Sequence, residues 1–294
     1  MRVLITGVNG QLGSDIGKEM IKRGHMVIGS DKHKSSKHCP LYTKMDITDK
    51  NAVNLNMKDI NPDIVIHCAA WTEVDKGEIA GNIDKMFRIN TVGTINLANA
   101  CRECGCRMLY ISTDYVFNGE GDKPWATEHN IDRQPLNVYG VSKFLGEKAV
   151  INVVPRYYIV RSSWLFGKNG KNFVKSVLDA TERNKPFSVV DDQIGRPTYT
   201  KDLAKLIAEI IATDKYGIYH VTNEGENVSR YEYAKEILRQ AEKTTDIFPI
   251  ATKDCRGKLA SRPLNSRLDT SKIEESGFTP LPDWKDALWR YLNE

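Results

Sequence analysis

The sequence predicts an α/β fold in which helices cover both faces of a doubly wound parallel sheet, with a smaller, mostly C-terminal lobe. Short apolar runs alternate with amphipathic stretches through the first half of the chain. The first run leads directly into a glycine-rich turn, and beyond Ser162 the alternation loosens into turn-rich segments. These observations favour one domain over residues 1–166 and a second lobe over residues 167–294.

The expected strands are short runs of mainly apolar residues, several of them rich in valine and isoleucine. They span residues 3–6, 27–30, 64–68, 107–112 and 157–161. The expected helices show apolar residues at helical spacing and span residues 14–23, 50–57, 83–104, 141–151, 172–184, 200–212 and 229–242. A further strand over residues 217–222 is expected to return to the main sheet, so the boundary between the two parts is not one clean cut.

Composition excludes several classes of function. The 42 basic and 38 acidic residues give a net charge of +4, too small to indicate nucleic-acid binding, although it suits an anionic small molecule. No apolar run approaches the roughly 20 residues of a membrane helix. The start Met1-Arg2-Val3 passes straight into the first strand and leaves no room for a signal peptide. We therefore expect a cytoplasmic protein with neither a nucleic-acid nor a membrane partner.

Six cysteines are present, and Cys101, Cys104 and Cys106 lie close together. A structural zinc site needs four ligands, usually supplied as two separated pairs. Cys101 and Cys104 could form one such pair, but the sequence contains no second pair. We expect reduced thiols here and assign no metal.

The glycine-rich turn predicts a dinucleotide site. Gly7 permits the sharp turn after the first strand, Gly10 allows the backbone to approach a pyrophosphate, and Gly13 allows the helix to pack on the strand. The G-x-x-G-x-x-G spacing differs from the standard G-x-G-x-x-G fingerprint and favours the short-chain reductases. A loop used only for turning is the alternative. The glycine-rich turn therefore predicts that residues 1–166 form a Rossmann domain that binds NAD(P).

Asp31 ends the second strand, at about the place where a carboxylate meets the ribose 2′-hydroxyl of NAD. Lys32, His33 and Lys34 follow at once and could hold the 2′-phosphate of NADP. The sequence leaves the choice between NADH and NADPH open.

Asp46 and Ile47 end the next segment. The carboxylate could accept from the adenine amino group while the isoleucine covers the ring. An ordinary helix N-cap at Asp46 or Thr48 is the alternative.

Tyr139 and Lys143 are the most informative pair in the chain. Four residues apart on a helix, they share one face. A phenol has a reference pKa of about 10, and a nearby ammonium group favours its phenolate. Such a pair alone is ordinary helix surface, but with the glycine turn it predicts a site that reduces a carbonyl group.

Other candidate residues follow the strands, at the edge where ligands collect in doubly wound sheets. Ala69, Ala70, Trp71 and Thr72 could let a cofactor lie against the backbone. The Thr113 hydroxyl could hold a carbonyl oxygen beside Tyr139, with Asp114 next to it. Trp164 offers an aromatic plane suited to a sugar face, and a core aromatic is the alternative.

Taken together, these motifs resemble the dTDP-4-dehydrorhamnose reductase family of extended short-chain dehydrogenases/reductases. The motifs lie in order along nearly the whole chain and comprise Gly7/Gly10/Gly13, Asp46-Ile47 and residues 69–76, 112–117, 136–143, 161–164 and 260–266.

The resemblance implies reduction of the C4 ketone of dTDP-4-dehydro-L-rhamnose by NADPH or NADH. Tyr139 would protonate the C4 oxygen, Lys143 would lower the tyrosine pKa and bind the nicotinamide ribose, and Thr113 would orient the sugar. The matching cofactor positions are Gly10, Gln11, Leu12, Asp46, Ile47, Ala70, Trp71 and Thr72. The matching substrate positions are Thr113, Asp114, Trp164, Asn172 and Arg196, with Arg262 as the partner of the diphosphate.

The chain departs from the family at Trp71, where relatives often carry tyrosine or histidine. Metal ligands and dimer contacts of relatives find no clear match, so no metal is assigned and a homodimer stays open. Two alternatives of other classes remain: a regulatory subunit resembling the beta subunit of methionine adenosyltransferase, and a nucleotide-sugar epimerase or dehydratase that retains its cofactor.

Overall fold

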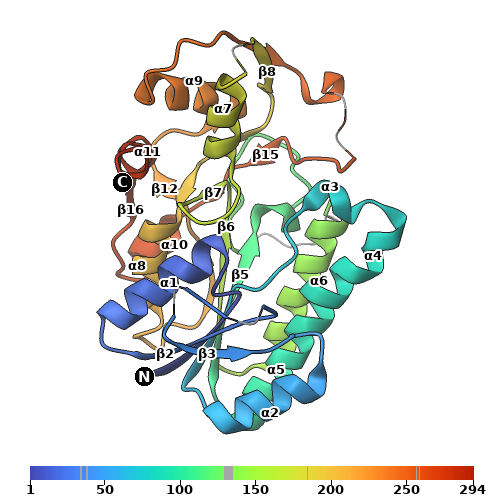
Figure 1. Ribbon diagram of the computed structural model, residues 1–294, viewed down its shortest axis with the longest axis vertical. Coiled ribbons are helices and arrows are strands. Elements are labelled where there is room, and N and C mark those ends of the chain that lie inside the picture. The colour runs from blue at the N-terminus through green and yellow to red at the C-terminus, as the bar shows by residue number, and fades with distance from the viewer. Residues whose placement is uncertain (34, 38, 129–134, 184, 256, 258) are drawn as a thin grey trace.

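The computed structural model describes residues 1–33, 35–37, 39–128, 135–183, 185–255, 257 and 259–294. Within these residues, the centre is a seven-stranded parallel sheet with the strand order β11-β6-β5-β4-β1-β2-β3 (Figure 1). The strands are β1 (Arg2–Thr6), β2 (Met26–Asp31), β3 (Leu41–Lys44), β4 (Ile64–His67), β5 (Arg107–Thr113), β6 (Tyr157–Ser162) and β11 (Gly217–His220). Strand order reverses between β1 and β4, which confirms the predicted doubly wound sheet.

Two layers of helices cover the sheet because alternate strand residues point to opposite faces. Helices α1 (Gln11–Lys22) and α8 (Thr200–Ile210) pack on the face that carries Val3 and Ile5. Helices α2 (Lys50–Ile60), α5 (Gly93–Cys104) and α6 (Val138–Val153) bury the other face. Both α8 and β11 come from the second half of the chain, so that half contributes to both parts of the molecule.

The helix expected over residues 83–104 is present, but it begins at Ala80 and is not α-helical throughout. The chain instead forms α4 (Ala80–Phe87), a π-helical turn (Arg88–Val92) and then α5. Inside the turn, the buried Asn90 amide donates to the Trp71 carbonyl and to Ser142 Oγ, and its Oδ1 accepts from the Trp71 N–H. A π-turn holds one residue more than an α-helical turn, and π-turns inside helices are frequent at functional sites.

The second lobe lies at the top of Figure 1 and has its own apolar core. Phe166, Tyr199, Tyr233 and Trp284 are almost fully buried there. The lobe contains α7 (Phe173–Thr181), α9 (Arg230–Gln240), α11 (Trp284–Leu292) and the short strands β7 (Leu165–Phe166), β8 (Phe187–Val190), β9 (Ile194–Gly195), β10 (Thr198–Tyr199), β12 (Asn223–Glu224), β13 (Val228–Ser229), β14 (Ile247–Ile250), β15 (Asn265–Ser266) and β16 (Leu281–Asp283). The remaining short helices are α3 (Val74–Gly77) and α10 (Ser271–Glu275), with 3₁₀ turns at Asp114–Val116 and Thr252–Asp254. The expected end of α7 at Asn184 lies outside the described residues.

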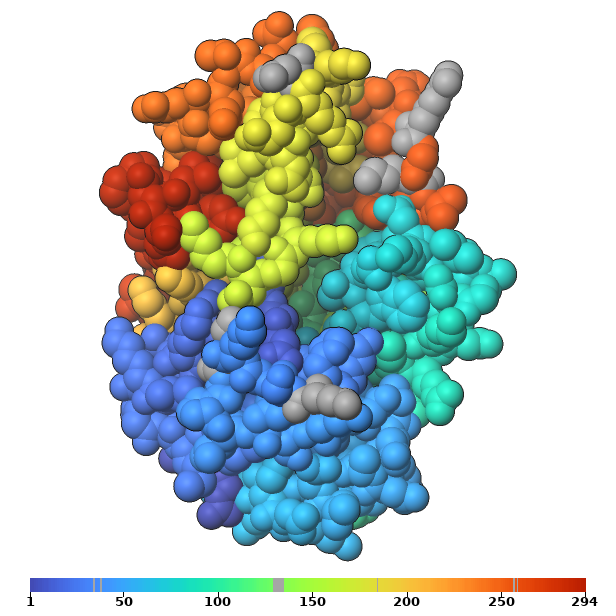
Figure 2. Space-filling model, in the orientation of Figure 1, coloured from blue at the N-terminus to red at the C-terminus, as the bar shows by residue number. Residues whose placement is uncertain are grey.

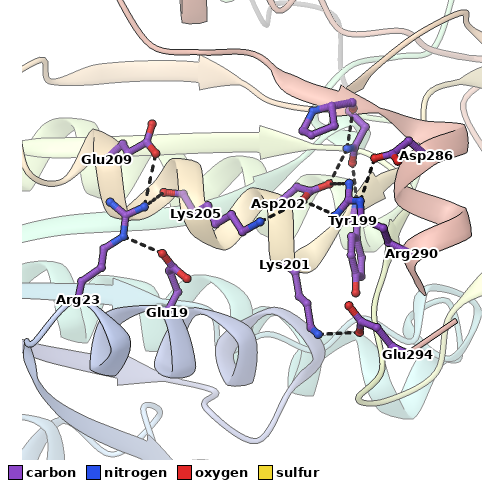
Figure 3. Close-up of polar contacts among 12 residues, drawn as sticks. Glu19, Arg23, Tyr199, Lys201, Asp202, Lys205, Glu209, Asp286, Arg290 and Glu294 are labelled. Atoms are coloured by element: carbon purple, nitrogen blue, oxygen red, sulfur yellow. Dashed lines mark hydrogen bonds and ion pairs between the residues drawn. The ribbon is translucent and has the colours of Figure 1, made fainter. Parts of the chain in front are cut away.

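A polar junction joins the lobe to the sheet layer (Figure 3). Asp202, in the first turn of α8, is 2% exposed and accepts two hydrogen bonds from the Arg290 guanidinium of α11, at 2.8 and 2.6 Å. The Asn223 amide donates to the same carboxylate at 3.0 Å. On the other side of α8, Arg23, the C-cap of α1, binds Glu209. Helix α8 is therefore held from both sides.

Candidate active site

Two glycines shape the turn between β1 and α1. Gly7 has φ +68°, and a Cβ on it would lie 2.6 Å from the Ala69 nitrogen. A Cβ on Gly13 would lie 2.3 Å from the Gly7 carbonyl oxygen. Helix α1 begins after Gly10, which has no side chain that could cap it. The first N–H groups of α1 are thus placed to bind phosphate oxygens.

Beside this turn lies a cavity of about 840 Å³ at the carboxyl ends of β1, β2 and β4. Figure 2 shows a hollow in this region, where the blue, teal and yellow-green segments meet. Of the predicted cofactor residues, those that line the cavity are Gly7, Gly10, Asp31, Asp46, Ile47, Ala69, Ala70, Trp71 and Thr72. The size and lining of the cavity fit a dinucleotide.

The other predicted cofactor residues lie elsewhere. Leu12 packs in the core between α1 and the sheet, and Gly13 packs on Gly7. Gln11 Oε1 accepts from the Asn172 amide of the second lobe, at 3.0 Å. Tyr139 and Lys143 are on α6 and do not line the cavity.

Asp31 and His33 both line the cavity, with His33 Nε2 3.9 Å from Asp31 Oδ1. Lys32 also lines it and is exposed, whereas Lys34 lies outside the described residues. A carboxylate and neighbouring basic groups therefore lie together on the wall of the cavity.

Asp46 is not a helix N-cap, and neither is Thr48. Asp49 caps α2 by accepting from the N–H groups of Asn51 and Ala52. Asp46 instead accepts from the N–H and the hydroxyl of Thr48, both at 2.9 Å. The N-cap alternative for Asp46 and Thr48 is therefore wrong, and the Asp46 carboxylate remains at the cavity wall.

The helix α6 brings Tyr139 and Lys143 beside the end of β5. Lys143 is 3% exposed, and its Nζ donates to the Ile111 carbonyl at 2.7 Å. Burial lowers the Lys143 pKa to about 7, while the Glu147 carboxylate one turn further along α6 opposes this shift. The ammonium charge of Lys143 therefore depends on pH near neutrality.

The pKa of Tyr139 is raised above its ordinary value, mainly by burial and then by the Asp114 carboxylate. A hydrogen bond with Thr113 acts in the opposite direction. The direction differs from the lowered pKa expected from Lys143, because burial penalises the phenolate and the Asp114 carboxylate repels it. Thr113 Oγ1 donates to Asp114 Oδ1 at 3.0 Å, at the end of β5 on which α6 packs. With its raised pKa, Tyr139 is a neutral phenol near pH 7.

Asp114 is 3% exposed and lies directly behind this hydroxyl pair. Its Oδ2 accepts from the Ser266 hydroxyl of the second lobe. Burial raises the Asp114 pKa to about 6, although both hydroxyl donors lower it.

We expect the ionisation of Asp114 to appear in the pH profile. Above pH 6 the carboxylate accepts from both hydroxyls, whereas below it the protonated acid loses acceptor capacity. The value of kcat/KM should therefore fall as pH drops through about 6. Initial rates from pH 5 to 9 on wild type and Asp114→Asn test this, because the variant should lack the acidic limb. The exposed Asp59→Asn is the matched control, and an unchanged acidic limb in Asp114→Asn would contradict the assignment.

A buried ion pair lies under the same helix. Glu147 and Arg161 are both 0% exposed, and the guanidinium binds the carboxylate at 2.9 and 2.8 Å. Arg161 also lies 3.2 Å from Nε2 of His220, whose Nδ1 contacts the Trp125 carbonyl at 2.9 Å. A carbonyl only accepts, so Nδ1 carries the proton and Nε2 accepts from Arg161. Sequence reasoning did not assign Glu147, Arg161 or Asn90, because their partners are distant in the chain.

The second lobe closes over the site through the segment 259–262. Asp75 Oδ1 accepts from the N–H groups of Leu259 and Ala260, and Oδ2 binds Arg262 at 2.7 Å. Asn137, the N-cap of α6, donates to the Ser261 carbonyl at 2.7 Å. Arg262 is thus held beside the start of the helix that carries Tyr139.

The remaining predicted substrate residues have different surroundings. Trp164 has φ +51°, a strained value for a residue other than glycine, and its ring packs near Tyr233. Asn172 caps α7 and donates to Gln11 and to the Gly167 carbonyl. Arg196 is 9% exposed, and its guanidinium donates to the Leu268 carbonyl and the Thr270 hydroxyl.

All six cysteines are free thiols. Among the residues that the structure describes, no group of three or more His, Cys, Asp or Glu side chains could hold a metal ion. The same part of the chain contains no helix both long and apolar enough to cross a membrane.

Comparison with known proteins gives consistent results. The family model described as the RmlD substrate binding domain matches residues 1–294. The chain is 37% identical over 293 residues to the spore coat polysaccharide biosynthesis protein SpsK of Bacillus subtilis, covering 100% of this chain and 97% of that one. It is 36% identical over 300 residues to dTDP-4-dehydrorhamnose reductase of Aggregatibacter actinomycetemcomitans, covering 98% and 97%. A crystal structure of dTDP-4-dehydrorhamnose reductase from Bacillus anthracis in complex with NADP superposes with a TM-score of 0.91 at 38% identity, covering 99% and 98%.

Proposed function

The chain belongs to the RmlD substrate binding domain family, and from that premise we propose that it reduces the C4 ketone of dTDP-4-dehydro-L-rhamnose to give dTDP-L-rhamnose. It is an NAD(P)H-dependent oxidoreductase of the dTDP-4-dehydrorhamnose reductase type. The arrangement that supports this proposal is Tyr139 on α6, one turn before the buried Lys143 and next to the end of β5, which carries Thr113.

The coenzyme has a place that fits it. The cavity is bounded by the open N-terminus of α1, where Gly7 and Gly13 have no room for a Cβ. Asp31 and Asp46 supply acceptors toward the ribose and adenine ends. When bound, the reduced nicotinamide coenzyme supplies the hydride.

In the proposed mechanism Tyr139 gives its proton to the C4 oxygen as negative charge develops there. Its raised pKa keeps this proton in place until the alkoxide, a much stronger base, draws it away. The phenolate that remains is stabilised by the Lys143 ammonium group, whose Nζ is anchored on Ile111. On substrate binding the single O–H of Thr113 turns from Asp114 to the C4 oxygen, and Trp164 and Arg262 contact the substrate from the second lobe.

We also propose that the enzyme acts in the cytoplasm and forms a homodimer. Six free thiols are typical of a reducing compartment. Val92, Ile95 and Leu145 are 42%, 37% and 39% exposed at or on the neighbouring helices α5 and α6, which suits self-association.

The proposed reaction predicts equimolar consumption of sugar ketone and reduced coenzyme. Purified protein is mixed with dTDP-4-dehydro-L-rhamnose and either NADH or NADPH, coenzyme oxidation is followed by absorbance, and the product is identified by NMR. The control substrate is dTDP-glucose, which has no ketone to reduce. Conversion of the sugar without net coenzyme oxidation would instead indicate an epimerase or dehydratase.

A further inference from the structure

Arg230 is a cation in the second lobe for which neither the sequence motifs nor the mechanism above gives a role. It is the first residue of α9, and Ser229 and Glu232 form a capping box around it. Its N–H donates to the Gln193 carbonyl at 3.2 Å. The backbone from which this side chain extends is therefore fixed.

The guanidinium of Arg230 lies over two aromatic rings. Its central carbon is 3.8 Å from the centroid of the Trp164 ring and 4.9 Å from that of Phe173. Stacking of this kind uses the face of the guanidinium and leaves the N–H groups at its edge available. Trp164 thus orients Arg230 without satisfying its hydrogen-bond donors.

Within the described part of the chain, the Arg230 guanidinium makes no hydrogen bond and no ion pair. Burial lowers its pKa, yet arginine keeps its charge in proteins. Arg230 is half-buried, so its guanidinium is a partly desolvated cation whose N–H groups can still reach a ligand in the cleft. The other arginines around the cleft differ, because Arg196 and Arg262 are bound by protein groups.

The charges that face Arg230 place it in the active site. Tyr115 and Asp114 raise its pKa, and Arg262 lowers it. Asp114 already accepts from Thr113 and Ser266, and burial raises the Tyr115 pKa to about 12, so its hydroxyl is neutral. Arg230 therefore lies within electrostatic range of both the Thr113–Asp114 pair and Arg262.

We propose that Arg230 binds the diphosphate of the nucleotide-sugar substrate, with its edge N–H groups on the phosphate oxygens and Arg262 as its neighbour. This rests on the proposed function for the substrate class. A guanidinium fork matches phosphate oxygens in a paired geometry, and the substrate anion removes the penalty of the unpaired cation. Trp164 then has a second role, since it holds the arginine that anchors the substrate.

The test is the binding of dTDP, measured by calorimetry on wild type, Arg230→Gln and Arg230→Lys. Loss of hydrogen bonds to a charged group predicts a dTDP dissociation constant about 10- to 100-fold higher in Arg230→Gln. Arg230→Lys should lose less of the dTDP affinity than Arg230→Gln, because lysine keeps the positive charge. It should still bind dTDP more weakly than wild type, because lysine lacks the planar fork of N–H groups. Thymidine, which has no phosphate, should bind wild type and Arg230→Gln equally. NADPH should also bind both equally.

The matched control is Arg239→Gln on the same helix, where Arg239 is exposed and pairs with Glu236, and its dTDP binding should equal that of wild type. Unchanged dTDP binding in Arg230→Gln overturns the proposal. So does an equal loss of thymidine and NADPH binding with a lower melting temperature, since the arginine would then be structural. Failure of the reductase assay together with Arg230-dependent dTDP binding would reject the proposed reaction and keep this site.

Discussion

Replacing Tyr139 with phenylalanine is expected to lower kcat by about 10²- to 10⁴-fold, the usual contribution of a positioned general acid. The variant loses only the hydroxyl of Tyr139. The edge-to-face contact of its ring with Tyr115, 5.7 Å between centroids, should persist. The free energy of unfolding should therefore change by about 1 kcal/mol or less.

Steady-state kinetics with dTDP-4-dehydro-L-rhamnose and urea denaturation of the same preparations separate the two effects. Tyr219→Phe is the control, because the Tyr219 hydroxyl is also satisfied inside the protein, by the Lys215 carbonyl at 2.6 Å, but on the edge strand β11. That variant should keep its kcat. If Tyr139→Phe turns over at the wild-type rate, another group protonates the C4 oxygen.

Removing Arg161 should have the largest effect on stability. Arg161→Met leaves the Glu147 carboxylate in a fully buried position without its partner, and breaking such a pair costs about 3–5 kcal/mol. Part of the lost interaction links α6 to β6, so the position of Tyr139 and Lys143 should also become less defined. In the double variant Arg161→Met/Glu147→Leu no charge is stranded, and most of the lost stability should return.

Urea denaturation of both single variants and the double variant measures this coupling as a double-mutant cycle. Lys76→Met is the control, since Lys76 and Glu73 form an exposed ion pair that should contribute about 1 kcal/mol or less. A loss below about 1 kcal/mol in Arg161→Met would mean that water or another group compensates Glu147.

Much of the sheet could be predicted because its signals are local. The structure of an apolar run such as residues 64–68, or of the glycine turn after β1, is determined by residues that are adjacent in the sequence. The same holds for Tyr139 and Lys143, which share a helix face by spacing alone. The carboxyl ends of parallel strands then bring Thr113 and Asp114 to the same edge.

The features that could not be predicted depend on distant partners. Nothing near Asn90 signals the π-turn, since its contacts are with Trp71 and Ser142, 19 and 52 residues away. Arg262 and Asp75, 187 residues apart, meet only after the second lobe is in place. Arg230 was missed for the same reason, because Trp164 and Phe173 define its orientation.

The path of the chain between the two parts has a consequence for how they move. After β6 the chain enters the lobe, returns with α8 and β11 to the sheet, and then leaves for the lobe again (Figure 1). Any opening of the cleft must bend every one of these crossings together, which restricts the lobe to small rotations. A fragment ending at residue 166 would lack the edge strand β11 and the helix α8, which packs on α1. We therefore expect that neither half folds independently. Chimaeras with relatives must accordingly exchange the interleaved segments as a set.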